Sequence, residues 1–145
     1  MAYSEQQAAV YRGEGRVTDP SALRRVGTET EAQRFTDSIT CQDWWAERYP
    51  HVVRVEVEAL HGNTRRVSAV SRGHHDRGLG VVGIVKEGVS VLTLLHEMAH
   101  CVTESHDGHG PVFVREYLTI TYQVAGSAAY AELRAALVEA GAEVG

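Results

Sequence analysis

The chain has 145 residues, of which 43% are hydrophobic and 23% are charged. This length fits one hydrophobic core, and the composition is that of a globular protein rather than a disordered or membrane-embedded one. The 14 basic and 19 acidic residues give a net charge of −5, so we do not expect a diffuse basic surface that holds nucleic acid. A local patch stays open, built from Arg65, Arg66, Arg72 and Arg77.

The cysteine content and the distribution of apolar residues bear on the cellular location of the protein. Cys41 and Cys101 are too few for a disulfide scaffold, which favours a reducing compartment. The N-terminal residues contain no apolar run of the kind found in secretion signals, and no stretch approaches the roughly 18 apolar residues of a membrane span. We therefore expect a cytoplasmic protein without a transmembrane helix.

The first 27 residues carry weak periodicity, interrupted by glycines and Pro20. They predict a short helix near residues 5–11 followed by irregular chain, set apart from a main domain over residues 28–145 and contributing little to function. From Thr28 the pattern sharpens, because Thr28 and Glu31 form a capping box. Apolar residues then recur at helical spacing, which predicts one long helix of about five turns ending at Pro50.

Strand signals follow this helix. Valines alternate with charged residues over 53–58, which is the period of a half-buried strand. A turn at 61–64 predicts a second strand around 66–71, antiparallel to the first. After a glycine-rich loop over 72–80, the apolar run at 81–86 predicts a third strand, either buried on both faces or lying at an edge beside a cleft.

The remaining chain is helical in pattern. Residues 89–103 predict a core helix with one polar stripe. After a loop over 104–110, Pro111 suits the first turn of a helix. A last helix is expected from Ser127, as its N-cap, to about Ala140, with Gly141 as the stop. The predicted class is α+β: a small three-stranded twisted sheet, a long N-terminal helix, a core helix and two C-terminal helices.

The core helix carries the sequence His96-Glu97-Met98-Ala99-His100, an HExxH motif. Residues four apart on a helix differ in direction by about 40°, so both imidazoles can bind one metal ion. Glu97 lies about 60° beyond His100, which suits a hydrogen bond to a water at the metal better than coordination. Because polar residues on a buried helix are costly without partners, a metal is the simplest way to satisfy them.

A catalytic zinc ion takes three protein ligands and leaves a position for water. Three residues of the following loop compete for the third place: His106, Asp107 and His109. His106 has the spacing of metzincins, although Thr103 stands where those proteins need glycine to bend the chain. His109 lies between Gly108 and Gly110, where the backbone is free to turn the imidazole toward the helix.

The run Leu94–His100 followed by Gly108-His109-Gly110-Pro111-Val112-Phe113 resembles SprT-like and Spartan metalloproteases, which are zincins. The resemblance covers about residues 89–118. It is closer still to a small family of uncharacterised metallohydrolases in actinobacteria and their phages, which is similar also over Gln6–Glu14. The resemblance implies a zincin-like fold and a zinc site of His96, His100 and His109. The DNA-related role of Spartan is not implied, because the chain has no cysteine cluster for a zinc ribbon.

The expected function is therefore that of a zinc metallopeptidase acting on a peptide or protein. Glu97 would be the general base, taking a proton from the attacking water and passing it to the leaving amine. Substrate backbone would pair with the strand at 81–86. The alternative is a non-catalytic module, in which His106 joins the other three histidines in a closed structural zinc site.

Other residues receive smaller roles. Glu104 is a candidate hydrogen-bond partner of a ligand histidine. His74, His75 and Asp76 read as a solvated loop beside the cleft. Cys101 points toward the core as a reduced thiol, and Tyr117 lies on an apolar stripe.

Overall fold

The computed structural model describes residues 2–60, 69–74, 78–103 and 108–145. Over these residues the fold is α+β, as the sequence predicted, with helices α1–α7 and strands β1–β5. Contacts divide the chain into two units, one of residues 25–102 and one of residues 1–24 with 103–145. The expected separation of 1–27 from an independent domain at 28–145 stays a prediction.

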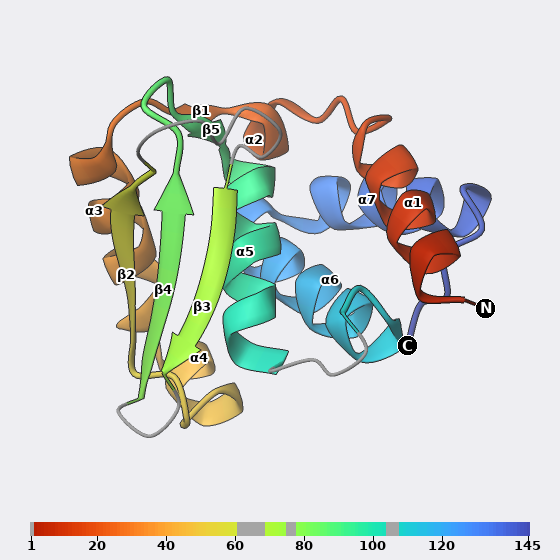
Figure 1. The fold of residues 1–145 in the computed structure, drawn as a ribbon. Coiled ribbons are helices and arrows are strands. Elements are labelled where there is room, and N and C mark those ends of the chain that lie inside the picture. Colours follow the sequence, from red (N-terminus) through yellow and green to blue (C-terminus); the bar gives the residue numbers. More distant parts are fainter. Residues whose placement is uncertain (1, 61–68, 75–77, 104–107) are drawn as a thin grey trace. The chain divides into compact units, whose positions relative to one another are not determined.

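The first unit is built on a three-stranded sheet in which β4 (Leu79–Ile84) lies between β2 (Arg54–Ala59) and β3 (Ala69–His74) (Figure 1). β4 pairs with β2 in parallel and with β3 antiparallel, so that Val82 faces Val57 on one side and Ser71 on the other. The first two predicted strands do run in opposite directions, as expected, but they do not pair with each other as a hairpin would. The more apolar third strand inserts between them, because the centre of a sheet suits a strand buried on both faces.

The central position of β4 decides between the two alternatives for the apolar run at 81–86. Val81, Val82 and Ile84 are buried. The alternative that the strand is buried on both faces is therefore confirmed, and the alternative that it lies at an edge was wrong. Gly80 lies directly against α5 (Val91–Thr103), since a Cβ at Gly80 would stand 2.9 Å from Sγ of Cys101. The helix that carries the HExxH motif therefore packs on the middle of the sheet.

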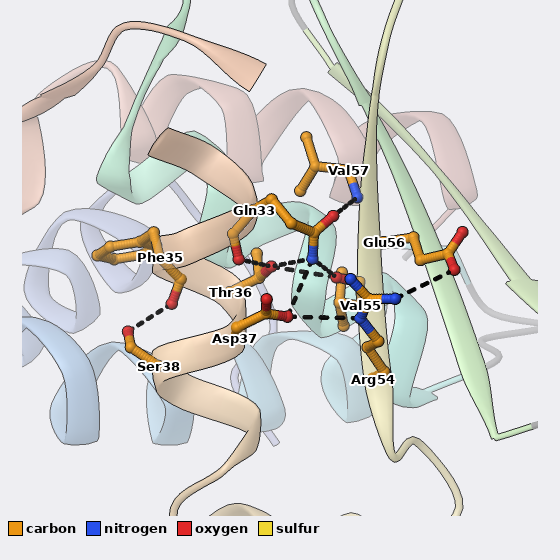
Figure 2. Close-up of polar contacts among 9 residues, drawn as sticks. All are labelled: Gln33, Phe35, Thr36, Asp37, Ser38, Arg54, Val55, Glu56 and Val57. Carbon is orange, nitrogen blue, oxygen red and sulfur yellow. Dashed lines mark hydrogen bonds and ion pairs between the residues drawn. The ribbon is translucent and has the colours of Figure 1, made fainter. Parts of the chain in front are cut away.

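The outer edge of β2 is covered by side chains of α3 (Glu29–Thr40) (Figure 2). Gln33 Nε2 donates to the carbonyl oxygen of Val55 at 2.9 Å, and Gln33 Oε1 accepts from the backbone N–H of Val57 at 2.8 Å. Buried Thr36 donates to the same Val55 oxygen at 3.1 Å. These bonds use backbone groups that an edge strand would otherwise offer to another strand.

The long helix expected from Thr28 to Pro50 is two helices, α3 and α4 (Asp43–Arg48), so that prediction was wrong. Its start was correct, because the Thr28 side chain accepts from the Glu31 N–H at 3.0 Å. Gln42 is extended, with ψ 148°, and interrupts the helix. The new direction buries Trp45, whose indole donates to the carbonyl oxygen of Val52 at 2.8 Å.

A second, two-stranded pairing joins β1 (Arg25–Val26) to β5 (Val89–Ser90). The sequence predicted neither strand. Residues 89 and 90 were expected inside the helix, which instead begins at Val91 because the two preceding residues pair with β1. The Arg25 guanidinium adds hydrogen bonds to the carbonyl oxygens of Glu87 and Gly88, both at 3.0 Å.

The second unit contains α1 (Tyr3–Glu14), α2 (Pro20–Leu23), α6 (Pro111–Ala125) and α7 (Ser127–Glu139). α1 is longer than the helix expected at 5–11, and α2 was not predicted. α1 packs closely on α7, because a Cβ at Gly13 would stand 2.8 Å from Cδ2 of Leu137. Arg12 donates to the carbonyl oxygen of Ala140 at 2.9 Å. The first helix is thus held by the last one.

The two C-terminal helices were predicted nearly correctly. α6 begins at Pro111 and buries Phe113, Tyr117 and Ile120. α7 ends at Glu139, and Gly141 follows it with φ +90°. Ser127 was expected as the N-cap of this helix, which was wrong: Gly126 occupies that position and Ser127 is the first helical residue.

Candidate metal centre

The polar stripe predicted on α5 is present in the structure. His96 is 3% exposed and Glu97 is 8% exposed, while His100 is half-buried. Most other residues of this helix are apolar and buried, including Leu94, Leu95, Met98 and Ala99, while Thr93 and Thr103 are half-buried. A helix buried on nearly all sides thus brings two imidazoles and one carboxyl group into the interior, where such groups require specific partners.

The two histidines of the motif point in the same direction. Their ring centroids are 5.0 Å apart, with an angle of 63° between the ring planes. Their separation by four residues on one continuous helix produces this geometry without any contribution from distant parts of the chain. The pairing of the imidazoles is therefore a local property of the sequence.

Cys101, which follows His100, is a free and buried thiol, as predicted. Burial, together with the negative charge of Glu97, raises the pKa of Cys101 to about 12, and a hydrogen bond with the backbone of Val81 opposes this shift. The thiol consequently stays protonated at neutral pH. The sulfur atom lies against Gly80 of β4, on the side of the helix that faces the sheet.

His109 lies in the short segment that precedes α6. It is 5% exposed, and Gly108 before it has φ +63°, a left-handed conformation that glycine adopts without strain. Pro111 begins α6 two residues later. The glycine-permitted turn that the sequence suggested next to His109 is therefore present.

His96, His100 and His109 each offer one ring nitrogen, and the three nitrogens lie within 4.8 Å of one another. Three imidazoles at this spacing could hold one metal ion. Nitrogen donors of this type suit zinc, copper, iron or nickel, whereas magnesium and calcium prefer oxygen donors. The donor set thus fits a transition-metal ion.

The competing ligands His106 and Asp107 lie outside the described residues, and so does Glu104. The same holds for the loop residues His75 and Asp76 and for Arg65, Arg66 and Arg77 of the possible basic patch. Among the other candidates, Tyr117 is fully buried and its hydroxyl donates to Glu14 at 2.7 Å. The expectation of a core role for Tyr117 is confirmed.

Sequence reasoning assigned little function to the first 27 residues and missed their relation to His109. Gln6, on α1, is buried and donates to the carbonyl oxygen of His109 at 3.0 Å. A single buried glutamine does not alter the spacing of apolar residues from which buried positions are predicted. The one available signal was the resemblance of the segment Gln6–Glu14 to actinobacterial and phage metallohydrolases.

Comparison of the chain with family models, curated proteins and solved structures gave no match. The resemblance to SprT-like proteins therefore stays a prediction. Among the described residues, no helix has both the length and the apolar character needed to cross a membrane.

Proposed function

We propose that this chain is a zinc-dependent metallopeptidase with a zincin-like site, in which His96, His100 and His109 hold the ion and Glu97 is the general base. The observation that carries the proposal is the three-histidine group together with a buried glutamate next to His96 on the same helix. Three protein ligands leave a coordination position for water, which is the arrangement of catalytic rather than structural zinc sites.

A bound Zn²⁺ would supply Lewis acidity, which lowers the pKa of a coordinated water toward about 7 and stabilises negative charge on a carbonyl oxygen. Glu97 would accept a proton from the water that attacks the peptide carbonyl. It would then donate this proton to the nitrogen of the leaving amine.

The placement of β4 changes the proposed mode of substrate binding. Because β4 is the central strand, its backbone is already paired on both sides, and the proposed pairing of substrate with residues 81–86 was wrong. The outer edge of β2 is bonded to Gln33. An extended peptide would therefore add to the outer edge of β3, Ala69–His74.

The test is the substitution Glu97→Gln, which keeps size and hydrogen bonding but removes the ability to accept a proton. Wild-type protein purified without a histidine tag should contain about one zinc ion per chain and cleave members of a random peptide library, read by mass spectrometry. Glu97→Gln should retain the zinc and the fold and lose cleavage activity by 100-fold or more, a typical effect of removing a general base.

The matched control is Glu87→Gln, an exposed glutamate outside the site, which should cleave like the wild type. If Glu97→Gln keeps activity within about tenfold of wild type, the barrier has changed by only ~1.4 kcal/mol. Such a result would remove Glu97 from the mechanism. A zinc-loaded wild-type protein that cleaves no peptide would instead favour the non-catalytic module.

A further inference from the structure

The third histidine of the proposed site differs from the other two in lying outside a helix. His109 stands between Gly108 and Gly110, and glycine restricts the backbone less than any other residue. A ligand on such a segment loses conformational entropy when it binds a metal, unless other contacts already fix it. Two of the contacts to His109 come from Gln6 and Tyr11 on α1, near the other end of the chain.

Gln6 makes the most specific of these contacts. Its Nε2 group donates to the carbonyl oxygen of His109 at 3.0 Å and to that of Glu143 at 2.9 Å. Its Oε1 atom accepts from the backbone N–H of Glu143 at 2.8 Å. Gln6 is 4% exposed, so these bonds form away from water, where an unmade bond is costly. One amide group thereby fixes the backbone of His109 to the C-terminal segment.

Aromatic rings hold the imidazole itself. The ring of Tyr11, on α1, lies 5.2 Å from that of His109 at an angle of 58°, and the ring of Phe113 lies 5.0 Å from it at 79°. Tyr3, at the start of α1, lies so close to Gly108 that a Cβ added there would collide with its ring. Backbone and side chain of the ligand are thus both in contact with α1.

α1 is in turn anchored to α6, the helix that begins directly after the ligand segment. The hydroxyl of buried Tyr117 donates to a carboxylate oxygen of Glu14 at 2.7 Å. A hydrogen bond to a charged acceptor is stronger than one between neutral groups. The helix that contacts His109 therefore has a fixed position relative to the start of α6.

We infer that Gln6 is a positioning residue for the metal ligand His109, and that α1 serves as the support that orders this ligand before the ion binds. The inference rests on the proposed function, since it requires His109 to be a ligand. Its consequence is that residues 3–14 are part of the metal centre, although none of them supplies a ligand atom.

The experiment measures zinc affinity by competition with a chromophoric chelator, so that it requires no substrate. Gln6→Ala should weaken zinc binding about tenfold or more, the range found when groups that orient metal ligands are removed. The matched control is Gln7→Ala, a half-buried glutamine on the same helix, which should bind zinc like the wild type. Circular dichroism of both zinc-free variants at the assay temperature shows that they are folded.

A double substitution separates positioning from general destabilisation. In the His109→Ala background, Gln6→Ala should have no further effect on zinc affinity, because the ligand it orders is gone. An equal loss in both backgrounds would show a merely structural role and overturn the inference. Should Gln6→Ala fail to fold, Tyr11→Ala provides the second test: this side chain is 52% exposed, and its loss should weaken zinc binding without unfolding the protein.

The outcomes distinguish this inference from the function on which it rests. A wild-type chain that binds no zinc contradicts the proposed metal site as a whole. A wild-type chain that binds one zinc ion tightly, with unchanged affinity in both Gln6→Ala and Tyr11→Ala, overturns only the role of α1.

Discussion

The candidate metal ligands of this chain are supported in different ways in its two units. In the unit of residues 25–102, His96 and His100 stand four positions apart on α5, and the helix alone aligns their rings. In the unit of residues 1–24 and 103–145, His109 is held by Gln6, which is 103 positions away. One pair of ligands is organised by local geometry, while the third depends on contacts between distant segments.

Ligands aligned by one helix are easy to find in a sequence, whereas a ligand held by distant segments is easy to disrupt. A local pair survives most changes elsewhere, because only the helix must form. A ligand ordered by long-range contacts is sensitive to every segment that supports it, and none of those segments is marked by the motif. Substitutions of the ligands, of Gln33 and of Glu132 test this contrast.

The largest effect is expected for the histidines themselves. His96→Ala and His109→Ala should each lower zinc affinity by about 100-fold or more, since each removes one of three ligands. His106→Ala should leave the zinc content near one ion per chain. Chelator competition and elemental analysis measure both quantities.

The control for this series is His51→Ala. His51 contacts the carbonyl oxygen of Val102, near the end of α5, at 2.8 Å, and its loss should leave one zinc ion bound. If His106→Ala removed the zinc and His109→Ala did not, the ligand assignment would pass to His106, and the resemblance to SprT-like proteins would be misleading at this position.

The local part of this contrast was predictable from the sequence, and the long-range part was not. The end of α5 at Thr103, the start of α6 at Pro111, the buried apolar run at Val81–Ile84 and the metal-ligand spacing all follow from short-range patterns. The strand order β2-β4-β3 does not, because the hydrophobic pattern gives the period of each strand but not its neighbours. The sequence therefore suggested a hairpin where the chain makes a parallel pairing.

The same limit applies to the candidate site. His96, Glu97 and His100 are recognisable because one helix period connects them. For the third metal ligand, His106 and Asp107 remained alternatives to His109 until the family resemblance favoured His109. Gln6 and Tyr11 could not be found by pattern at all, since their role comes from hydrogen bonds and ring contacts between residues about 100 positions apart.

An intermediate effect, on stability rather than metal binding, is expected from Gln33→Ala in the unit that contains the sheet. The substitution leaves the N–H of Val57 without the side-chain oxygen that it now contacts at 2.8 Å. The free energy of unfolding should fall by about 1–3 kcal/mol, the cost of leaving a partly buried polar group unsatisfied. Urea denaturation followed by circular dichroism measures it.

The control for the edge of β2 is Gln123→Ala, on the exposed face of α6, which should unfold like the wild type. Zinc affinity should stay unchanged in Gln33→Ala, because α3 does not carry the ligands. Light scattering should show increased association of Gln33→Ala, since the edge of β2 becomes available to another strand. Wild-type stability in this variant would show that Gln33 does not protect the edge.

The smallest effect is expected from Glu132→Gln, which changes a contact between distant segments that does not reach His109. Glu132, on α7, accepts hydrogen bonds from the Thr18 hydroxyl at 2.7 Å and from the backbone N–H groups of Thr18 and Asp19 at 2.7 and 2.8 Å. These bonds, that of the Thr18 hydroxyl above all, lower the pKa of Glu132 below its usual 4.5. The ionised carboxylate is therefore favoured in the folded state.

A lowered pKa in the folded state fixes the sign of the pH dependence. The carboxylate contributes stability at pH values above the unfolded pKa, and this contribution disappears as the pH falls through the lower pKa of the folded state. The difference in Tm between wild type and Glu132→Gln should be small and constant from about pH 6 to 8 and should narrow below about pH 4.5. Glu139→Gln, at an exposed position on the same helix, is the control that removes the same charge. Zinc affinity should be equal in all three proteins at neutral pH, because the contacts of Glu132 with Thr18 and Asp19 do not involve His109. A loss of zinc in Glu132→Gln would mean that the ligand depends on the stability of the whole unit rather than on Gln6.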